Sequence, residues 1–567
     1  MNHTNDRDST KSGCCTTDDR SSKRSQQRNR TPGKPSSSTT DGESAKNGHC
    51  SAQREPAVQD KNTDRREHSV HDKKIGRHKN TEQQENLGDT QNYHGSRHFE
   101  IVEPVLPENL SCYIEALLDA IQTAFPLSAA HKKNLQYAIR ELSRDLTSER
   151  TERRKDYLGM PRSLAAYLNY FLPWNVLRIS QIIANLEIKL SSGDSILDIG
   201  SGPWTVPIAF WIARPELRSV KLHWILGDRV KKPLESGKAI FTAFIQLAAN
   251  LLSKSGDASG SDGASGNNSK SGDNSGDRLS KNSDQDDISD SSTSGKTSQS
   301  GSASYDELAQ NCPWEFTCVR EQFPSLALQK RDRPFALITA ANVLNELFWD
   351  DRIHLDVRAQ GVLKSFAGNT VPGTRVLIIE PGEPRSGTML AALRESTIIH
   401  NGTILGPCTH AKSCPMPGSY LSAAMRAIKS GKPFPKGVPE PVNMPASRTK
   451  YPWCHFVLNA KSVPKQLQKL SIESGIPKDR LVASWLYAEL PHKHAKVQKS
   501  TSGCIRLVSD KIVVEGNIYR YACGEPGYIM AGRPFSAYPS GTVVRLENLG
   551  AYCNKRVDKK THALILE

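Results

Sequence analysis

Between residues 195 and 382, short apolar runs alternate with helical stretches, and this alternation restricts the fold more than any other feature. Helical patterns such as ESGKAIFTAFIQLAANLL separate the runs. Strands that alternate with helices predict a parallel sheet with helices on both faces. Ligands of such sheets bind at the carboxyl ends of the strands, where we expect the functional residues. The five predicted strands are SILDIG, LHWILGD, WEFTCVR, FALITAANV and TRVLIIEPG.

The segments on either side have different patterns. Residues 106–190 predict helices, because apolar residues recur at three- and four-residue steps. Within them, SLAAYLNYFLPWNVLRISQIIANLEIKL predicts two helices broken near Pro173. After Gly382, extended pieces such as YPWCHFVL and KIVVEGN predict a smaller, β-containing appendage folded around a metal.

Two segments are too polar to build a core. Residues 1–98 contain no Leu before Leu87 and no aromatic residue before Tyr93, which predicts disorder. They also lack the apolar stretch of a signal peptide. Residues 253–304 are rich in Ser, Gly, Asp and Asn and predict a flexible insertion. No apolar run is long enough for a membrane span.

The net charge of +15 favours a polyanionic partner, and three basic clusters favour RNA. The alternative is a basic protein whose charge only keeps it soluble. The clusters are Arg229 with Lys231 and Lys232, Lys461 with Lys465 and Lys469, and residues 555–560.

The first predicted strand runs into a glycine loop, LDIGSGPWTVPIAFW. Gly200 and Gly202 let the backbone approach a nucleotide-like ligand closely, after a strand that ends near Asp198. The pattern is typical of the first loop of class I S-adenosylmethionine-dependent methyltransferases, although other dinucleotide folds share it. Asp228 ends the second strand and can accept hydrogen bonds from ribose hydroxyls; the alternative is a solvated loop acid.

The fourth strand runs into ITAANVLNELF, where Asn342 and Asn345 are predicted to face the substrate. The Asn/Asp-Pro-Pro-aromatic signature of amine methylation is absent, as is an obvious cysteine nucleophile. The catalytic residues therefore stay unassigned, and methyl transfer can proceed largely by proximity and orientation.

Four of the twelve cysteines stand in distinctive contexts. Cys408 and Cys414 lie six residues apart in the turn-rich loop GPCTHAKSCPMPG, and Cys454 and Cys523 follow beside short apolar runs. Four converging thiolates suit a [4Fe–4S] cluster or a structural zinc. The alternative is that single cysteines are small buried hydrophobes. His410 and His455 are adjacent alternative ligands.

Taken together, these motifs resemble the Rsm-twenty-two family, methyltransferase-like proteins of the small ribosomal subunit in mitochondria and bacteria. The resemblance covers about residues 106–535. It implies a [4Fe–4S] cluster on Cys408, Cys414, Cys454 and Cys523, S-adenosylmethionine at the glycine loop, and association with the small subunit during assembly. The motifs are AAYLNYFLPWNVLRI, LDIGSGP, NVLNEL, IIEPGEPRSG, GPCTHAKSCP, WCHF and ACGEPG.

The predicted fold class is therefore an α/β class I methyltransferase sheet with an N-terminal helical region and a C-terminal β-containing, metal-binding appendage. The donor site is predicted at Asp198, Gly200, Gly202, Asp228 and Asn342. The predicted parts are a low-complexity tail (1–98), a helical region (99–190), a Rossmann-like domain (191–405), an iron–sulfur-binding region (406–540) and a basic C-terminal tail (541–567).

Three functions are compatible with these features. The first is an rRNA methyltransferase, the second a non-catalytic assembly factor with an inherited fold, and the third a zinc-stabilised RNA-binding protein. The partner is small-subunit rRNA or a precursor particle, without a membrane. The location is the cytoplasm of a bacterial-type cell or, alternatively, the mitochondrial matrix. One departure from the family is Trp204 in the glycine loop, which either crowds the donor's methionine moiety or stacks elsewhere.

Overall fold

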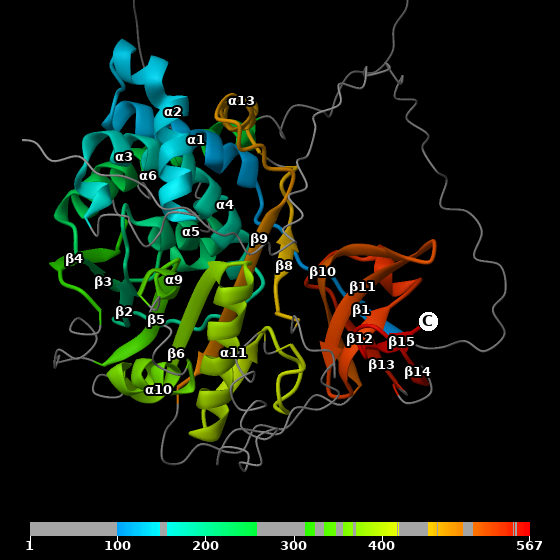
Figure 1. Cartoon of the computed structure of the whole chain (residues 1–567). Helices are drawn as coiled ribbons and strands as arrows, with labels where there is room; N and C mark the ends of the chain where they lie inside the picture. Colours follow the sequence, from blue (N-terminus) through cyan, green and yellow to red (C-terminus); the bar gives the residue numbers. More distant parts are fainter. Residues whose placement is uncertain are drawn as a thin grey trace, which may run out of the picture. The chain divides into compact units, whose positions relative to one another are not determined.

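The larger sheet contains the five predicted strands, in the parallel arrangement that their alternation with helices predicts (Figure 1). The computed structural model describes residues 99–147, 156–257, 312–323, 334–347, 355–366, 370–416, 418, 452–461, 463–490, 503–547, 549 and 553–567. The predicted disordered tail and nearly all of the 253–304 insertion lie outside these residues. The described residues all belong to one compact unit, Asn92–Glu567.

The sheet has the order β4-β3-β2-β5-β6-β9-β7, with β8 paired to β9. β2 to β6 are parallel, whereas β9 is antiparallel to β6, β7 and β8. The strands are β2 (Ser195–Ile199), β3 (His223–Asp228), β4 (Glu315–Arg320), β5 (Phe335–Ala341), β6 (Thr370–Pro381), β7 (Thr403–Gly406), β8 (Phe456–Leu458) and β9 (Leu481–Glu489).

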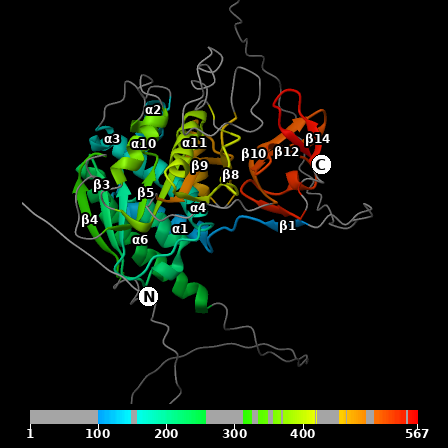
Figure 2. The same cartoon turned by 90° about the horizontal axis from the view of Figure 1, so that it is seen from below.

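Helices cover both faces of this sheet (Figure 2). Side chains alternate along the strands, so Ile196 joins the core beneath one helical layer while Leu197 joins the core beneath the other. The first layer contains α1 (Leu110–Ala124), α2 (Ala129–Leu146), α3 (Pro161–Ala166), α4 (Leu172–Ile183), α5 (Thr205–Ala213) and α6 (Lys231–Asp257). The second contains α10 (Leu355–Phe366) and α11 (Pro384–Ile399).

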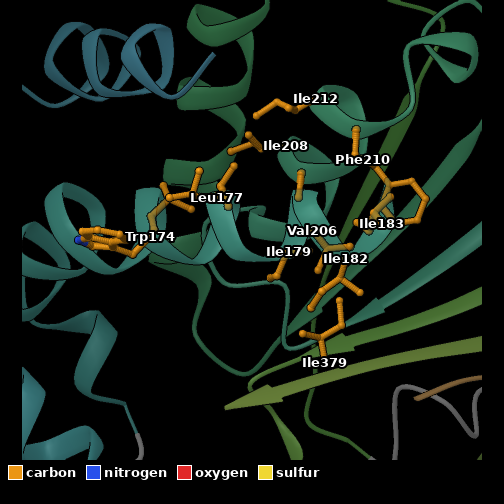
Figure 3. Packing of buried hydrophobic residues seen from close by; sticks show 14 of the residues in the cluster. Trp174, Leu177, Ile179, Ile182, Ile183, Val206, Ile208, Phe210, Ile212 and Ile379 are labelled. Atoms are coloured by element: carbon orange, nitrogen blue, oxygen red, sulfur yellow. The ribbon is translucent and has the colours of Figure 1, made fainter. Parts of the chain in front are cut away.

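The first layer forms a continuous apolar core against the sheet (Figure 3). Leu177 and Ile183 of α4 and Ile208 of α5 are completely buried. Ile379 of β6 meets them from the sheet side. Burying each such side chain contributes about 1.5–3 kcal/mol, so the α4–α5 packing holds the glycine loop, which enters α5, firmly above the sheet.

The predicted break near Pro173 is instead a single π-helical turn. Tyr167–Phe171 form this turn between α3 and α4, and the N–H of Leu172 bonds to the carbonyl of Tyr167. Pro173 then begins the next regular turn, where its missing N–H is tolerated. The chain therefore stays helical, and the turn contributes three aromatic side chains to the site described below.

A second sheet has the order β1-β13-β10-β11-β12-β15-β14 and its own core. All its neighbours are antiparallel except β12 and β15. The strands are β1 (Phe99–Val102), β10 (Cys504–Val514), β11 (Asn517–Gly524), β12 (Gly527–Ala531), β13 (Val543–Leu546), β14 (Cys553–Val557) and β15 (Leu564–Leu566).

These pairings cross the boundaries that the sequence suggested. The methyltransferase sheet continues past residue 405 through β8 and β9, and the second sheet takes β1 from the region predicted as helical. The segment predicted as a basic tail contributes three of its strands. Strand pairing between distant segments leaves no local signal, which explains the difference.

Two short helices complete the described elements around the site, α9 (Leu344–Leu347) and α13 (Lys465–Glu473). Nowhere in the described ranges is a helix both long and apolar enough to span a bilayer.

Candidate functional site

A cavity of about 400 Å³ opens at the carboxyl ends of the parallel strands, where the sequence placed the site. Gly200, Gly202, Asp228 and Asn342 line it together with the predicted substrate-facing Asn345. Asp198 does not line it. Its side chain is fully buried beneath the loop, and its Oδ1 accepts a 2.7 Å hydrogen bond from the Thr339 hydroxyl. Burial raises the pKa of Asp198 to about 7.

The glycine loop requires glycine for two reasons. Gly200 and Gly202 have φ angles of 66° and 51°, which side chains disfavour. A Cβ on Gly200 would also lie 2.5 Å from Cγ2 of Val343. The N–H of Gly202 donates to Oδ2 of Asp228 at 3.0 Å, and the N–H of Val230 donates to Oδ1 at 2.9 Å. Asp228 is therefore tied to the loop, and burial raises its pKa.

The loop after β5 is organised by a residue that the sequence analysis missed, Glu380. Its carboxylate accepts the backbone N–H groups of Val343, Leu344 and Asn345 at 3.0, 2.8 and 3.2 Å. Burial raises the pKa of Glu380 to about 8, although the three donors act in the opposite direction. Asn342, with φ 59°, precedes this turn. The interaction links adjacent strands, so no local motif predicts it.

Aromatic and cationic side chains form the opposite wall. Tyr167, Tyr170 and Phe171 come from the π-helical turn, and π turns recur at functional sites. Arg178 of α4 donates to Oδ1 of Asn342 at 2.6 Å. Lys478, from the segment before β9, lines the same cavity.

Trp204 does not obstruct the cavity. The indole is 2 % exposed and is not among the lining residues. It stacks on Phe316 of β4 with ring centroids 4.4 Å apart, and a Cβ on Gly237 would lie 2.2 Å from its Cδ1. Of the two alternatives, the structure supports stacking elsewhere: the glycine of α6 leaves the space that the indole fills.

The four distinctive cysteines line one further cavity. Cys408 and Cys414 lie in the loop after β7, Cys454 precedes β8, and Cys523 lies in β11. Burial raises the pKa of the Cys414, Cys454 and Cys523 thiols, and neighbouring cysteines raise it further. The thiolate, not the protonated thiol, is the metal ligand. A bound cation would replace the thiol protons and offset the repulsion between the resulting thiolates.

Arg394 of α11 holds the cysteine loop. Its Nε lies 3.1 Å from the Sγ of Cys408, and its Nη2 donates to the carbonyls of His410 and Lys412 at 2.8 and 2.7 Å. Its Nη1 contacts Oε1 of Glu395 at 2.5 Å, and the same oxygen accepts the N–H of Cys414. Burial lowers the pKa of Arg394, but Cys408 and Glu395 outweigh this and raise it. The guanidinium is therefore a permanent positive charge beside the thiols.

The two alternative histidine ligands have different positions. His410 lines the cysteine cavity and is 1 % exposed. His455 does not line it and stacks on Trp453. Within the described part of the chain, no group of three Cys, His, Asp or Glu side chains is arranged to hold a metal ion.

Residues 304–423 match the family model described as mitochondrial small ribosomal subunit Rsm22. The predicted family resemblance is confirmed. The Rsm22 match spans β4 to β7 and includes Cys408 and Cys414, whereas the glycine loop, Cys454 and Cys523 lie outside it. Among curated proteins, none matches this sequence.

The chain is also similar to solved methyltransferase structures. A SAM-dependent methyltransferase from Geobacter sulfurreducens in complex with S-adenosyl-L-homocysteine is 11 % identical; the likeness covers 56 % of this chain and 91 % of that chain, with a TM-score of 0.23. YjhP from E. coli is 10 % identical; that likeness covers 56 % of this chain and 92 % of YjhP, with a TM-score of 0.22. A putative methyltransferase from Thermoplasma acidophilum is 9 % identical; that likeness covers 54 % of this chain and 71 % of that chain, with a TM-score of 0.22.

The strand order of the larger sheet carries the fold assignment. Five parallel strands are followed by β9, which runs antiparallel between β6 and β7. The class I methyltransferase fold predicted from the sequence is confirmed. The chain thus combines a methyltransferase-like fold with the Rsm22 signature.

Proposed function

We propose that this protein binds S-adenosylmethionine, carries a [4Fe–4S] cluster, and acts on small-subunit rRNA during ribosome assembly. It does so as an rRNA methyltransferase or as an assembly factor that retains the methyltransferase fold. The convergence of Cys408, Cys414, Cys454 and Cys523 on one cavity carries this proposal. The same compact unit contains the glycine-loop cavity.

The side chains that line the cysteine cavity include donors of the kind that ligate a cluster. Four thiols line the cavity, together with the Arg394 guanidinium and the buried His410. Four thiolates suit either a [4Fe–4S] cluster or zinc, and the resemblance to the Rsm22 family implies the cluster. Bound there, a cluster supplies redox-capable iron and a covalent link between distant segments. Stoichiometric zinc without iron in anaerobically purified protein would favour the zinc-stabilised RNA-binding alternative.

The glycine-loop cavity suits the methyl donor. Gly200 and Gly202 provide close backbone approach, Asp228 provides a carboxylate for ribose hydroxyls, and Asn342 is held in place by Arg178. These side chains bind and orient the donor and leave the aromatic wall for a substrate base. No side chain of the cavity is assigned as a catalytic base, since orientation supplies much of the rate in such reactions.

Gly200→Ala is expected to abolish detectable donor binding, because the new Cβ meets Val343 and strains a left-handed residue. Gly193→Ala is the matched control: Gly193 also has a positive φ, 88°, but a Cβ there meets nothing within 4 Å. Calorimetric titration with S-adenosylhomocysteine measures the effect. Unchanged binding by Gly200→Ala would place the donor elsewhere, and no binding by the unmodified protein would favour the non-catalytic assembly factor.

The Rsm22 family description and the +15 net charge support a ribosomal partner. Of the two predicted locations, the family description supports the mitochondrial matrix. The basic clusters are partly neutralised: Lys231 pairs with Glu235 at 2.9 Å and Lys469 with Glu473 at 3.8 Å. RNA contacts therefore depend on the remaining cations of these clusters.

The protein is expected to sediment with small-subunit or precursor particles at low salt and to dissociate as the salt rises. About six phosphate contacts would lower the affinity roughly 10³-fold between about 50 and 200 mM salt. Sucrose-gradient sedimentation of lysate measures this. Recovery only at the top of a low-salt gradient would contradict the ribosomal assignment.

A further inference from the structure

A second cavity, of about 300 Å³, adjoins the donor cavity. Asn175, Arg178 and Lys478 line both cavities and therefore form their shared wall. The second cavity is completed by Trp174 and by residues 477 and 479–482, and none of the glycine-loop residues reaches it. It is a polar chamber beside the aromatic wall; Asp479 and Arg480 also line it, and Arg480 forms an ion pair with Asp510.

Lys478 has aromatic rather than acidic partners. Its Nζ lies 5.3 Å from the ring centroid of Tyr170 and 5.2 Å from that of Trp174. Among the residues that the structure describes, the charged group that acts on it is Arg178, a second cation. Burial and this neighbour lower the pKa of Lys478 to about 7. An anion at the shared wall would restore its full charge.

Arg178 is held rigidly beside it by neutral acceptors. Its Nη2 donates to Oδ1 of Asn175 at 2.9 Å and to Oδ1 of Asn342 at 2.6 Å, and its Nη1 donates to the Val482 carbonyl at 3.4 Å. The carboxylate that influences it, Glu380, is already occupied by three backbone N–H groups. Although Asp479 lines the second cavity, neither Arg178 nor Lys478 forms an ion pair with a carboxylate among the described residues.

The segment that carries Lys478 is anchored to the helical layer. The Tyr170 hydroxyl donates to the Ile476 carbonyl at 3.0 Å, and Trp174 Nε1 donates to the Ser471 hydroxyl at 3.2 Å. Arg140 of α2 donates to the Ser474 carbonyl at 3.1 Å. Three helical elements thus fix the position of the ammonium, as a preorganised binding site requires.

We propose that Arg178 and Lys478 bind a backbone phosphate of single-stranded RNA whose adjoining base enters the donor cavity against Tyr167, Tyr170 and Phe171. This inference rests on the proposed function and names the substrate's point of entry. Enzymes that modify a base hold it outside the helical stack against aromatic side chains and fix the backbone with cations. A phosphate fits better than the donor's carboxylate, because the second cavity lies away from the glycine loop and Asp228.

Lys478→Met tests the proposal, with a labelled single-stranded RNA of about eight nucleotides as the probe. We expect about tenfold weaker binding, the usual effect of losing one charged hydrogen bond, and a salt dependence reduced by about 0.7 in log–log slope. Lys478→Arg keeps the charge and should stay within about twofold of the unmodified protein. Lys189→Met is the control, since that lysine is exposed, pairs with Glu187 and belongs to none of the basic clusters.

Two outcomes would overturn the proposal. One is equal RNA affinity and salt slope for Lys478→Met and Lys189→Met. The other is a Lys478→Met variant that binds S-adenosylhomocysteine more weakly but RNA normally, which would assign the anion to the donor's carboxylate. Should Lys478→Met not fold, Lys478→Gln replaces it under the same criteria. Iron content and donor titration of the unmodified protein test the proposed function separately, so either can fail while the other stands.

Discussion

Cys523→Ser is expected to remove most of the iron from anaerobically purified protein and to loosen the second sheet. Cys523 lies in β11, whereas the other three proposed ligands come from segments around the larger sheet. A cluster ligated by Cys523 and by the other three cysteines would link the second sheet to the larger one. The binding free energy of such a group is also folding free energy. Elemental analysis, absorbance and thermal unfolding measure the effect.

Cys504→Ser is the matched control for this experiment. Cys504 is 2 % exposed and belongs to the same sheet, but it does not line the cysteine cavity. Its replacement should leave the iron content unchanged. Full iron retention by Cys523→Ser, or equal loss in both variants, would contradict the proposed ligand set.

Arg394→Met is expected to destabilise the protein by about 3–5 kcal/mol, because it leaves a buried carboxylate without its charge partner. Arg394 and Glu395 are 2 % and 3 % exposed, and their contact also supports the cysteine loop. The double variant Arg394→Met/Glu395→Gln should recover part of this loss, since the glutamine is neutral. Denaturant unfolding of the three proteins measures the difference.

The control is Arg162→Met, whose ion pair with Glu141 is exposed on both sides. Exposed pairs contribute about 0–1 kcal/mol, so this variant should unfold close to the unmodified protein. An Arg394→Met variant as stable as Arg162→Met would show that the buried pair does not hold the loop.

Features that depend on residues close together in the sequence could be predicted from the sequence alone. The five parallel strands follow from their alternation with helices, and Gly200 and Gly202 follow from a loop that needs left-handed backbone. The two helices predicted around Pro173 are present as α3 and α4, but the interruption between them is a π turn at Tyr167–Phe171 rather than a break in the helical path. The roles of the proposed donor and metal ligands stay predictions.

The sequence alone determined the parallel sheet, the position of the ligand edge and the four cysteines in distinctive contexts, because periodicity and short motifs carry that information. Only the tertiary structure decided the insertion of β9 beside β6 and the stacking of Trp204 on Phe316. It also decided that Arg178 and Lys478 lie on one cavity wall and that Arg394 supports Cys408. These contacts join residues from different elements, and their geometry depends on how the layers pack, which no local pattern encodes.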